Sequence, residues 1–220
     1  TTPTELMADL KRILPERGVE SHMQETITDI ELDGGRVTSV RSDKQTYQPE
    51  QVVLAAGSWS SRIARQIGMR LLLEGGKGYR INAHADNKIS MPAILCEAKA
   101  AVTPMRGFTR FAGTMEIAGI NHKIRKERVA AIAAAARRYY PNVQITAEEE
   151  EHAQCGLRPV SPDGMAYIGR SEKCDNLIFA TGHAMMGWSM GPATGKLVTE
   201  IASGKPTSMD LTPFHPDRRF

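Results

Sequence analysis

The sequence lacks any apolar run that could cross a membrane. Its longest strongly apolar stretches, residues 52–57 and 129–136, fall far short of the roughly 20 residues that a spanning helix requires. Cysteine is scarce, and Cys96, Cys155 and Cys174 are odd in number, widely spaced and outside any Cys-x-x-Cys pattern. These absences indicate neither a disulfide framework nor a zinc site, and a reducing cytoplasm is the default compartment.

An excess of charge of one sign is also missing. The chain has 28 Lys and Arg against 25 Asp and Glu, and the basic residues are scattered among acidic ones. This pattern predicts no nucleic-acid interface. The run of four glutamates at 148–151 invites a metal-binding or acid-base role, but consecutive carboxylates cannot converge on one face of a strand or helix. We interpret the run as a solvated turn or strand edge and predict no metal site.

No initiator methionine, charged leader or apolar leader precedes the first helix signal, so we expect the chain to begin within a longer protein. Thr2, Pro3 and Glu5 form a capping-box helix start, and Gly18 can close that helix. A hairpin is predicted around Asp33-Gly34-Gly35. The apolar run at 52–56 then predicts a buried strand that ends at Gly57, followed by a helix.

The pattern changes between residues 75 and 155. Short strand-like pieces at 79–83, 93–96 and 108–113 surround an Ala-rich helix from about Arg125 to Tyr140, which indicates a separate α+β lobe. After this lobe, strands are predicted at 165–169 and 177–180, and a helix is predicted to open at Pro192. The tail at 205–220 has three prolines and little periodicity, so we expect a surface arm.

Glycines recur between Gly182 and Gly195, directly after the last predicted strand. Glycines allow the backbone to approach a flat ligand, and free N–H groups at a following helix start favour an anionic or electron-accepting group. Taken alone, such a turn is explained equally well by tight packing. Its wider context is more specific, and the motifs in that context are Gly156-Leu157-Arg158-Pro159, Pro162-Asp163-Gly164, Ile168-Gly169, Gly182-His183, Gly187 and Pro192-Ala193-Thr194-Gly195.

In this order the motifs resemble the last segment of the D-amino acid and glycine oxidase superfamily of FAD-dependent enzymes. The resemblance extends from Pro3 to Gly204 and is densest after Cys155. It implies an α/β fold with an α+β lobe: a partial, discontinuous FAD-binding domain of the glutathione-reductase-like kind at 1–73 and 156–204, an inserted mixed β/α substrate lobe at 74–155, and a C-terminal arm at 205–220. The flavin contacts that it implies are Ile27, Ala56, Gly57, Gly182, His183, Met186, Gly187 and Trp188.

The superfamily places a Gly-x-Gly-x-x-Gly motif near its amino terminus to hold the pyrophosphate, and this chain has none. Gly75-Gly76-Lys77-Gly78 is no substitute, because a strand and not a helix is predicted after it. We therefore expect the isolated chain to hold FAD weakly or not at all. Completion of the site would require the missing N-terminal portion or another subunit.

Arg158 is the predicted substrate-binding residue, because the superfamily uses an arginine at this motif position to clamp the amino acid carboxylate. From the residues alone, a salt bridge near Pro159 would explain it as well. His183 has the side chain of a general base, but the resemblance assigns it to shaping the flavin turn, so no catalytic side chain is predicted. Tyr79 and Arg106 are further pocket candidates without a supporting motif.

The resemblance implies an FAD-dependent enzyme that oxidises the Cα–N bond of D-amino acids to a 2-oxo acid and ammonia, in amino acid catabolism. Related enzymes of glycine, sarcosine or hydroxyproline, either oxidases or dehydrogenases, remain alternatives. So does a non-catalytic half that needs a second chain. The expected location is the cytoplasm, with peripheral attachment to the inner face of a bacterial membrane as the other option.

Overall fold

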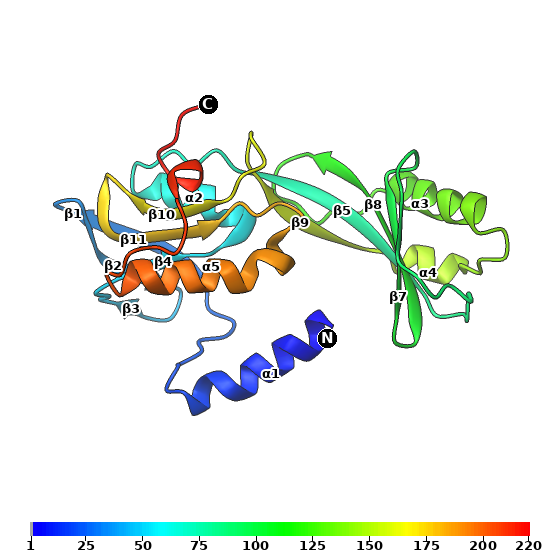
Figure 1. Cartoon of the computed structure of the whole chain (residues 1–220), viewed down its shortest axis with the longest axis horizontal. Coiled ribbons are helices and arrows are strands. Elements are labelled where there is room, and N and C mark those ends of the chain that lie inside the picture. The colour runs from blue at the N-terminus through cyan, green and yellow to red at the C-terminus, as the bar shows by residue number, and fades with distance from the viewer. Residues whose placement is uncertain (1) are drawn as a thin grey trace.

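A computed structural model describes residues 2–220, and Thr1 lies outside the described residues. The molecule is elongated, with a group of strands and helices at each end (Figure 1). The helices and strands are α1 (Pro3–Glu16), β1 (Ile27–Asp33), β2 (Arg36–Ser42), β3 (Thr46–Tyr47), β4 (Val52–Leu54), η1 (Gly57–Trp59), α2 (Ser60–Gln66), β5 (Glu74–Ala83), β6 (Ala93–Leu95), β7 (Ala100–Met105), β8 (Phe108–Ile117), α3 (Lys126–Tyr139), α4 (Ala147–Glu151), β9 (Gln154–Val160), β10 (Tyr167–Ser171), β11 (Cys174–Thr181), α5 (Gly187–Ala202) and η2 (Thr212–Phe214).

One end of the molecule is a three-layer arrangement around the sheet β10-β11-β4, in which β11 and β4 are parallel. Ala64 of α2 packs with Phe179 on one face of this sheet, whereas Leu197 of α5 packs with Ile168 on the other. The hairpin β1-β2 and the short β3 form a second sheet beside it. Parallel strands covered by helices on both faces are typical of nucleotide-binding α/β folds.

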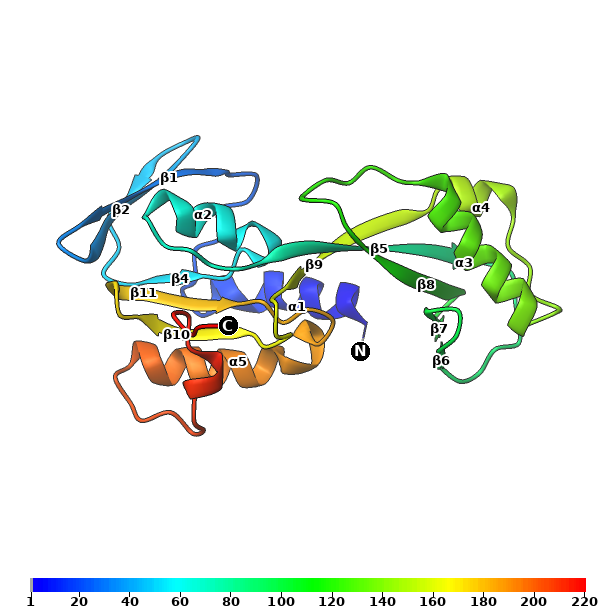
Figure 2. The ribbon, with the colours of Figure 1, turned by 90° about the horizontal axis from the view of Figure 1, so that it is seen from above.

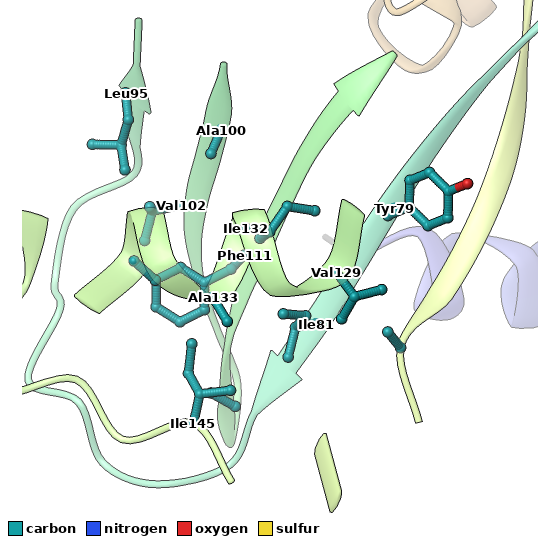
Figure 3. Close-up of a cluster of buried hydrophobic side chains, with 13 residues drawn as sticks. Tyr79, Ile81, Leu95, Ala100, Val102, Phe111, Val129, Ile132, Ala133 and Ile145 are labelled. Carbon is teal, nitrogen blue, oxygen red and sulfur yellow. The ribbon is translucent and has the colours of Figure 1, made fainter. Parts of the chain in front are cut away.

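The other end is a five-stranded sheet of order β6-β7-β8-β5-β9, with α3 packed against β5 and β8. Figure 3 shows the core between them, where Ile132 and Ala133 of α3 meet Ile81 and Phe111 of the sheet. Because side chains alternate along a strand, β5 and β9 carry a different set of residues on the face opposite α3, the open face of the sheet. Figure 2 shows β5 and β9 running side by side from this sheet toward the other end of the molecule.

Several predicted elements are confirmed. Thr2 and Glu5 form the capping box of α1 by exchanging hydrogen bonds, and the β1–β2 turn has Gly34 and Gly35 at positive φ. The structure also places residues 75–78 inside β5, and so not in a phosphate-binding loop. The predicted buried strand at 52–56 is found in shorter form, because β4 ends at Leu54. It is also not fully buried, since β4 is an edge strand and its Val53 is 45% exposed.

The start of α5 corrects the prediction that a helix opens at Pro192. The helix begins at Gly187, and Pro192 lies inside it. Because proline is common in the first turn of a helix, the prediction placed the helix start at Pro192. The early residues Gly187, Ser189 and Gly191 have weak helix propensity and gave no signal of their own. The free N–H groups of this helix consequently lie closer in sequence to Gly182 than predicted.

The glutamate run at 148–151 is helical and is neither a strand edge nor a simple turn. Thr146 and Glu149 form a capping box that opens α4, because Glu at the third helical position can bond back to the cap. Glu150 pairs with Arg137 of α3 at 2.7 Å. Among the residues described, no cluster of His, Cys, Asp or Glu has the arrangement of a metal site.

The tail after residue 204 packs against the molecule instead of extending into solvent. Leu211 and Phe214 contact the small core formed by Ala166 and Ile168, and Arg218 pairs with Asp163 at 2.9 Å. By contrast, α1 stands apart from the other elements in Figure 1, and none of its residues is buried. Over residues 2–220, no helix combines the length and the apolar character that crossing a membrane would require.

Candidate functional site

Two strand ends meet where glycines follow β4 and β11. The hydroxyl of Thr181 donates a hydrogen bond to the carbonyl oxygen of Gly57 at 3.1 Å, and the hydroxyl of Ser60 donates to Thr181 Oγ1 at 3.0 Å. Gly57 and Gly182 both have positive φ, which favours glycine. Because the carboxyl ends of neighbouring parallel strands form the ligand-binding edge of α/β sheets, this junction is the candidate site.

The turn after β11 has no room for a larger residue at its first position. A Cβ at Gly182 would lie 3.1 Å from a ring carbon of Tyr167 and 3.4 Å from a methyl of Leu73. Two residues later, Ala184 also has positive φ, at 47°, and its backbone N–H donates to the carbonyl oxygen of Pro159 at 3.0 Å. This bond ties the turn to the strand that carries Arg158.

The amino end of α5 presents large apolar side chains to solvent. Met186 is 55% exposed and Trp188 is 51% exposed, although both side chains are of types that usually pack. Trp59, which follows the other glycine, is also exposed and stacks on His122 with ring centroids 6.0 Å apart. Next to it, Ser58 Oγ is buried without a hydrogen-bond partner. Unpaired backbone donors, apolar rings and an orphaned hydroxyl are suited to a flat, polar-edged ligand.

Arg158 lies on the open face of β5 and β9. It pairs with Gly76 across the strands, and its guanidinium lies over Gly78, where any Cβ would overlap with it. Its one hydrogen bond in the structure runs from Nη1 to the carbonyl oxygen of Thr114 at 3.4 Å. In the part of the chain described, no carboxylate lies within 4.0 Å of Arg158, so a salt bridge does not account for this residue. Burial lowers the pKa of the half-buried guanidinium, but its basicity is high enough for it to stay charged.

Thr114, the residue that accepts from Arg158, adopts a strained backbone conformation. Its φ is +63°, which is uncommon for a threonine. It lies where β8 carries one extra residue relative to β5, between the pairs Tyr79–Gly113 and Lys77–Glu116. The sequence gave no sign of Thr114, because the bulge depends on strand pairing and not on a local motif.

The other predicted flavin contacts fall into two groups. Ala56 and His183 adjoin the two glycine turns, and His183 Nε2 lies 2.8 Å from Thr194 Oγ1. Burial lowers the pKa of His183, which favours the neutral form of the ring. Ile27 does not converge with them, since it begins β1 in the other three-stranded sheet with 37% of its surface exposed. Its predicted contact with the adenine end stays a prediction.

The structure does not bring the two further pocket candidates together with Arg158. Tyr79 is 1% exposed on the core face of β5, and its hydroxyl donates to Glu116 Oε2 at 2.6 Å. It therefore points away from Arg158, because neighbouring residues of a strand face opposite sides. Arg106 lies at the β7–β8 turn with 91% of its side chain exposed and pairs with Glu5 at 3.5 Å.

The sequence profile of FAD dependent oxidoreductases matches residues 1–201. The chain belongs to this family. A D-amino acid dehydrogenase of Paramagnetospirillum magneticum is 32% identical over 213 residues, which cover 96% of this chain and 50% of that protein. A D-amino acid dehydrogenase of Neisseria gonorrhoeae is 29% identical over 204 residues, covering 91% and 48%. The chain thus spans about half the length of the curated relatives it matches.

Solved structures share the fold. A glycine oxidase from Geobacillus kaustophilus superposes with a TM-score of 0.85 at 22% identity, covering 97% of this chain and 57% of that one. An L-proline dehydrogenase from P. horikoshii gives 0.85 at 20% identity, with 97% and 59% covered. These likenesses confirm the predicted fold class: a partial FAD-binding domain with a mixed β/α lobe.

The residues present fit one part of FAD. The exposed rings of Trp59 and Trp188, the buried free hydroxyl of Ser58 and the start of α5 at Gly187 suit the flat, polar-edged flavin ring. The described residues do not provide the usual site for the pyrophosphate of FAD. Among the residues described, no glycine-rich loop leads from a strand into a helix with the Gly-x-Gly-x-x-Gly spacing.

Proposed function

We propose that this chain is the substrate-binding and flavin-facing part of an enzyme that oxidises the Cα–N bond of D-amino acids to 2-oxo acids and ammonia. The observation that carries the proposal is Arg158, a half-buried guanidinium without a carboxylate partner, tied through Pro159 to the glycine turn at Gly182. An arginine in this setting suits a carboxylate ligand, because its planar fork donates two parallel hydrogen bonds.

The chain's own residues would position the substrate and exclude water. In this proposal Arg158 binds the α-carboxylate, and the sheet β5-β9 provides a rigid floor on which the guanidinium is fixed by the Thr114 carbonyl oxygen. The amino end of α5 would stabilise negative charge, because its first N–H groups lack helical partners. FAD, when bound, supplies the electron-accepting chemistry.

Within this proposal, the division into a partial FAD-binding lobe at 1–73 and 156–204 and a substrate lobe at 74–155 remains a prediction. Its second boundary falls inside β9, a strand that joins the two ends of the molecule. We further infer a cytoplasmic enzyme of amino acid catabolism that is completed by a preceding polypeptide segment or a second subunit. The free thiols of Cys96, Cys155 and Cys174 support a reducing compartment.

Anaerobic mixing of the complete flavoprotein with D-amino acids, glycine, sarcosine and L-amino acids tests the reaction. We expect D-amino acids to bleach the flavin absorbance fastest. The named relatives of similar sequence favour D-amino acids over glycine or sarcosine as substrates. Bleaching by L-amino acids alone, or by 2-hydroxy acids alone, would refute the assignment and leave the fold unaffected.

A further inference from the structure

Arg158 is not the only arginine on the open face of the sheet. Arg80 lies on the same face, because it belongs to the alternate residues Gly76, Gly78 and Arg80 of β5, opposite Arg158, Gly156 and Gln154 of β9. Arg110 of β8 pairs with Asn82, the next residue of the same row. Three guanidinium groups therefore point from a single sheet face, on the side opposite α3.

These arginines are held in place without being neutralised. Arg80 Nε donates to Gln154 Oε1 at 3.2 Å, and Arg110 Nε donates to Asn82 Oδ1 at 3.0 Å. Both acceptors are neutral amides. Within residues 2–220, neither arginine has a carboxylate within 4.0 Å, and repulsion from Arg80 adds to burial in lowering the pKa of Arg110.

On the opposite side of the sheet, by contrast, two cations have carboxylate partners. Lys77 faces α3's side and pairs with Glu116 at 3.4 Å, and Arg137 of α3 pairs with Glu150 at 2.7 Å. The charges of Arg80 and Arg110 are thus left uncompensated on the open face, where they repel each other. An anionic ligand would remove this repulsion.

The spacing along β5 relates Arg80 to the carboxylate site. The guanidinium of Arg158 lies over Gly78, and Arg80 is two residues further, roughly 7 Å along the strand at about 3.3 Å per residue. Arg80 also lines a cavity of about 570 Å³ with Asn82, which Arg110 contacts. The second carboxylate of a short amino dicarboxylate would therefore approach Arg80 while its α-carboxylate remains on Arg158.

We propose that Arg80, assisted by Arg110, forms a distal anion subsite that selects amino acids with an acidic side chain, such as D-aspartate and D-glutamate. The assignment of the substrate class rests on the proposed function, but the anion subsite itself does not. Glu149 also lines the cavity, and its carboxylate is engaged by the backbone N–H groups of His84 and Thr146. Glu148 lines the cavity as well, and its side chain is exposed.

The test uses the complete flavoprotein and three variants with the same change of charge: Arg80→Gln, Arg110→Gln and, as a control, Arg138→Gln on the exposed side of α3. We expect Arg80→Gln to lower kcat/KM for D-aspartate and D-glutamate about 10-fold, as for loss of a charge-assisted hydrogen bond. Arg110→Gln should have a smaller effect, D-alanine should change less than about 2-fold, and the control should behave as the parent. Equal losses for D-alanine and D-aspartate, or a preference for D-lysine, would overturn the proposal.

A binding measurement separates this inference from the proposed function. Calorimetric titration with succinate and with acetate requires no turnover, and we expect succinate to bind more tightly, by a margin that Arg80→Gln removes. If that margin is present while no amine reduces the flavin, the oxidation of amino acids is refuted and the anion subsite stands. If D-alanine is oxidised but succinate binds no better than acetate, the subsite is refuted and the enzyme assignment stands.

Discussion

The backbone N–H of Ala184 donates to the carbonyl oxygen of Pro159 at 3.0 Å, and this hydrogen bond couples the glycine turn after β11 to the strand that carries Arg158. Ala184 has a positive φ, a conformation that the bond helps to hold. The two motifs that carry the candidate site are thereby kept in fixed relation, although about 25 residues separate them in the sequence.

Replacement of Arg158 by lysine tests the carboxylate clamp. Lysine keeps the positive charge but loses the planar fork, so one of two charge-assisted hydrogen bonds is lost. In the complete flavoprotein we expect kcat/KM to fall about 10- to 150-fold with the FAD content unchanged. Arg106→Lys, at an arginine that is 91% exposed, is the matched control. Parallel loss of FAD and activity would instead indicate a structural role for Arg158.

Cofactor retention by this chain alone is a second prediction. Because the described residues include a fit for the flavin ring but no Gly-x-Gly-x-x-Gly turn for the pyrophosphate, we expect the isolated chain to hold FAD weakly or not at all. The visible spectrum after gel filtration measures this directly. A stoichiometric yellow protein would contradict the prediction and require phosphate contacts that are not recognised in this sequence.

Local sequence rules predicted the elements that depend on neighbouring residues. The capping box at Thr2 and Glu5 and the paired glycines at 34 and 35 act within a few residues, and both are found as predicted. Strand β7 was missed, since Ala100 and Ala101 have little strand propensity and Pro104 is a strand breaker. Its place is set by pairing with β8, which covers its hydrogen bonds.

The candidate site, too, is predictable from the sequence only in part. Glycines at strand ends and a motif arginine can be identified along the chain, as Gly182 and Arg158 were. The position of the Arg158 guanidinium over Gly78, however, depends on the register of β5 with β9, strands separated by about 70 residues. Arg80 and Arg110 join this face for the same reason, so no local signal could have found them.

Two glycines test the backbone argument in opposite directions. Gly182→Ala should lower the free energy of unfolding by about 1–3 kcal/mol, because an L-residue is strained at φ +83° and the new Cβ would crowd Tyr167. Gly195→Ala, inside α5 with open space around the new methyl group, should raise it by up to about 1 kcal/mol. Urea unfolding of both variants supplies the comparison. The same sign for both would show that backbone conformation is not the deciding factor.

The tail contact between Arg218 and Asp163 should give stability a dependence on acid pH. Hydrogen bonds from Arg218 lower the pKa of Asp163 from 3.8 to about 2. Since the folded-state pKa is depressed, the contribution is complete above about pH 4 and is lost as the pH falls toward 2. Asp163 is partly exposed, so we expect Asp163→Asn to cost only about 1 kcal/mol at pH 7 and almost nothing at pH 2. Unfolding curves at both pH values measure this cost, with Asp33→Asn as an exposed control. An equal cost of Asp163→Asn at both pH values would contradict the prediction.

The last prediction concerns the buried ion pair of Lys77 and Glu116, whose two members are supported unequally by their other neighbours. Lys77 is 1% exposed, and its ammonium group lies 3.4 Å from Glu116 Oε1. Among the residues described, this group donates hydrogen bonds only to neutral oxygens, Asn121 Oδ1 at 2.8 Å and the Lys123 carbonyl at 3.0 Å. Glu116 has more support, from the Tyr79 hydroxyl at 2.6 Å and from Arg125 at 3.2 Å.

Removal of Glu116 should therefore be worse than removal of Lys77. Glu116→Leu leaves a buried cation without a carboxylate, which should cost about 3–5 kcal/mol of the free energy of unfolding. Lys77→Met leaves Glu116 with two partners and should cost about 1–3 kcal/mol. The double variant should lose less free energy of unfolding than the sum of the two single losses, because it leaves neither charge without its partner. Denaturant unfolding of the four proteins completes the cycle, and additive losses or a larger cost for Lys77→Met would contradict this account of the pair.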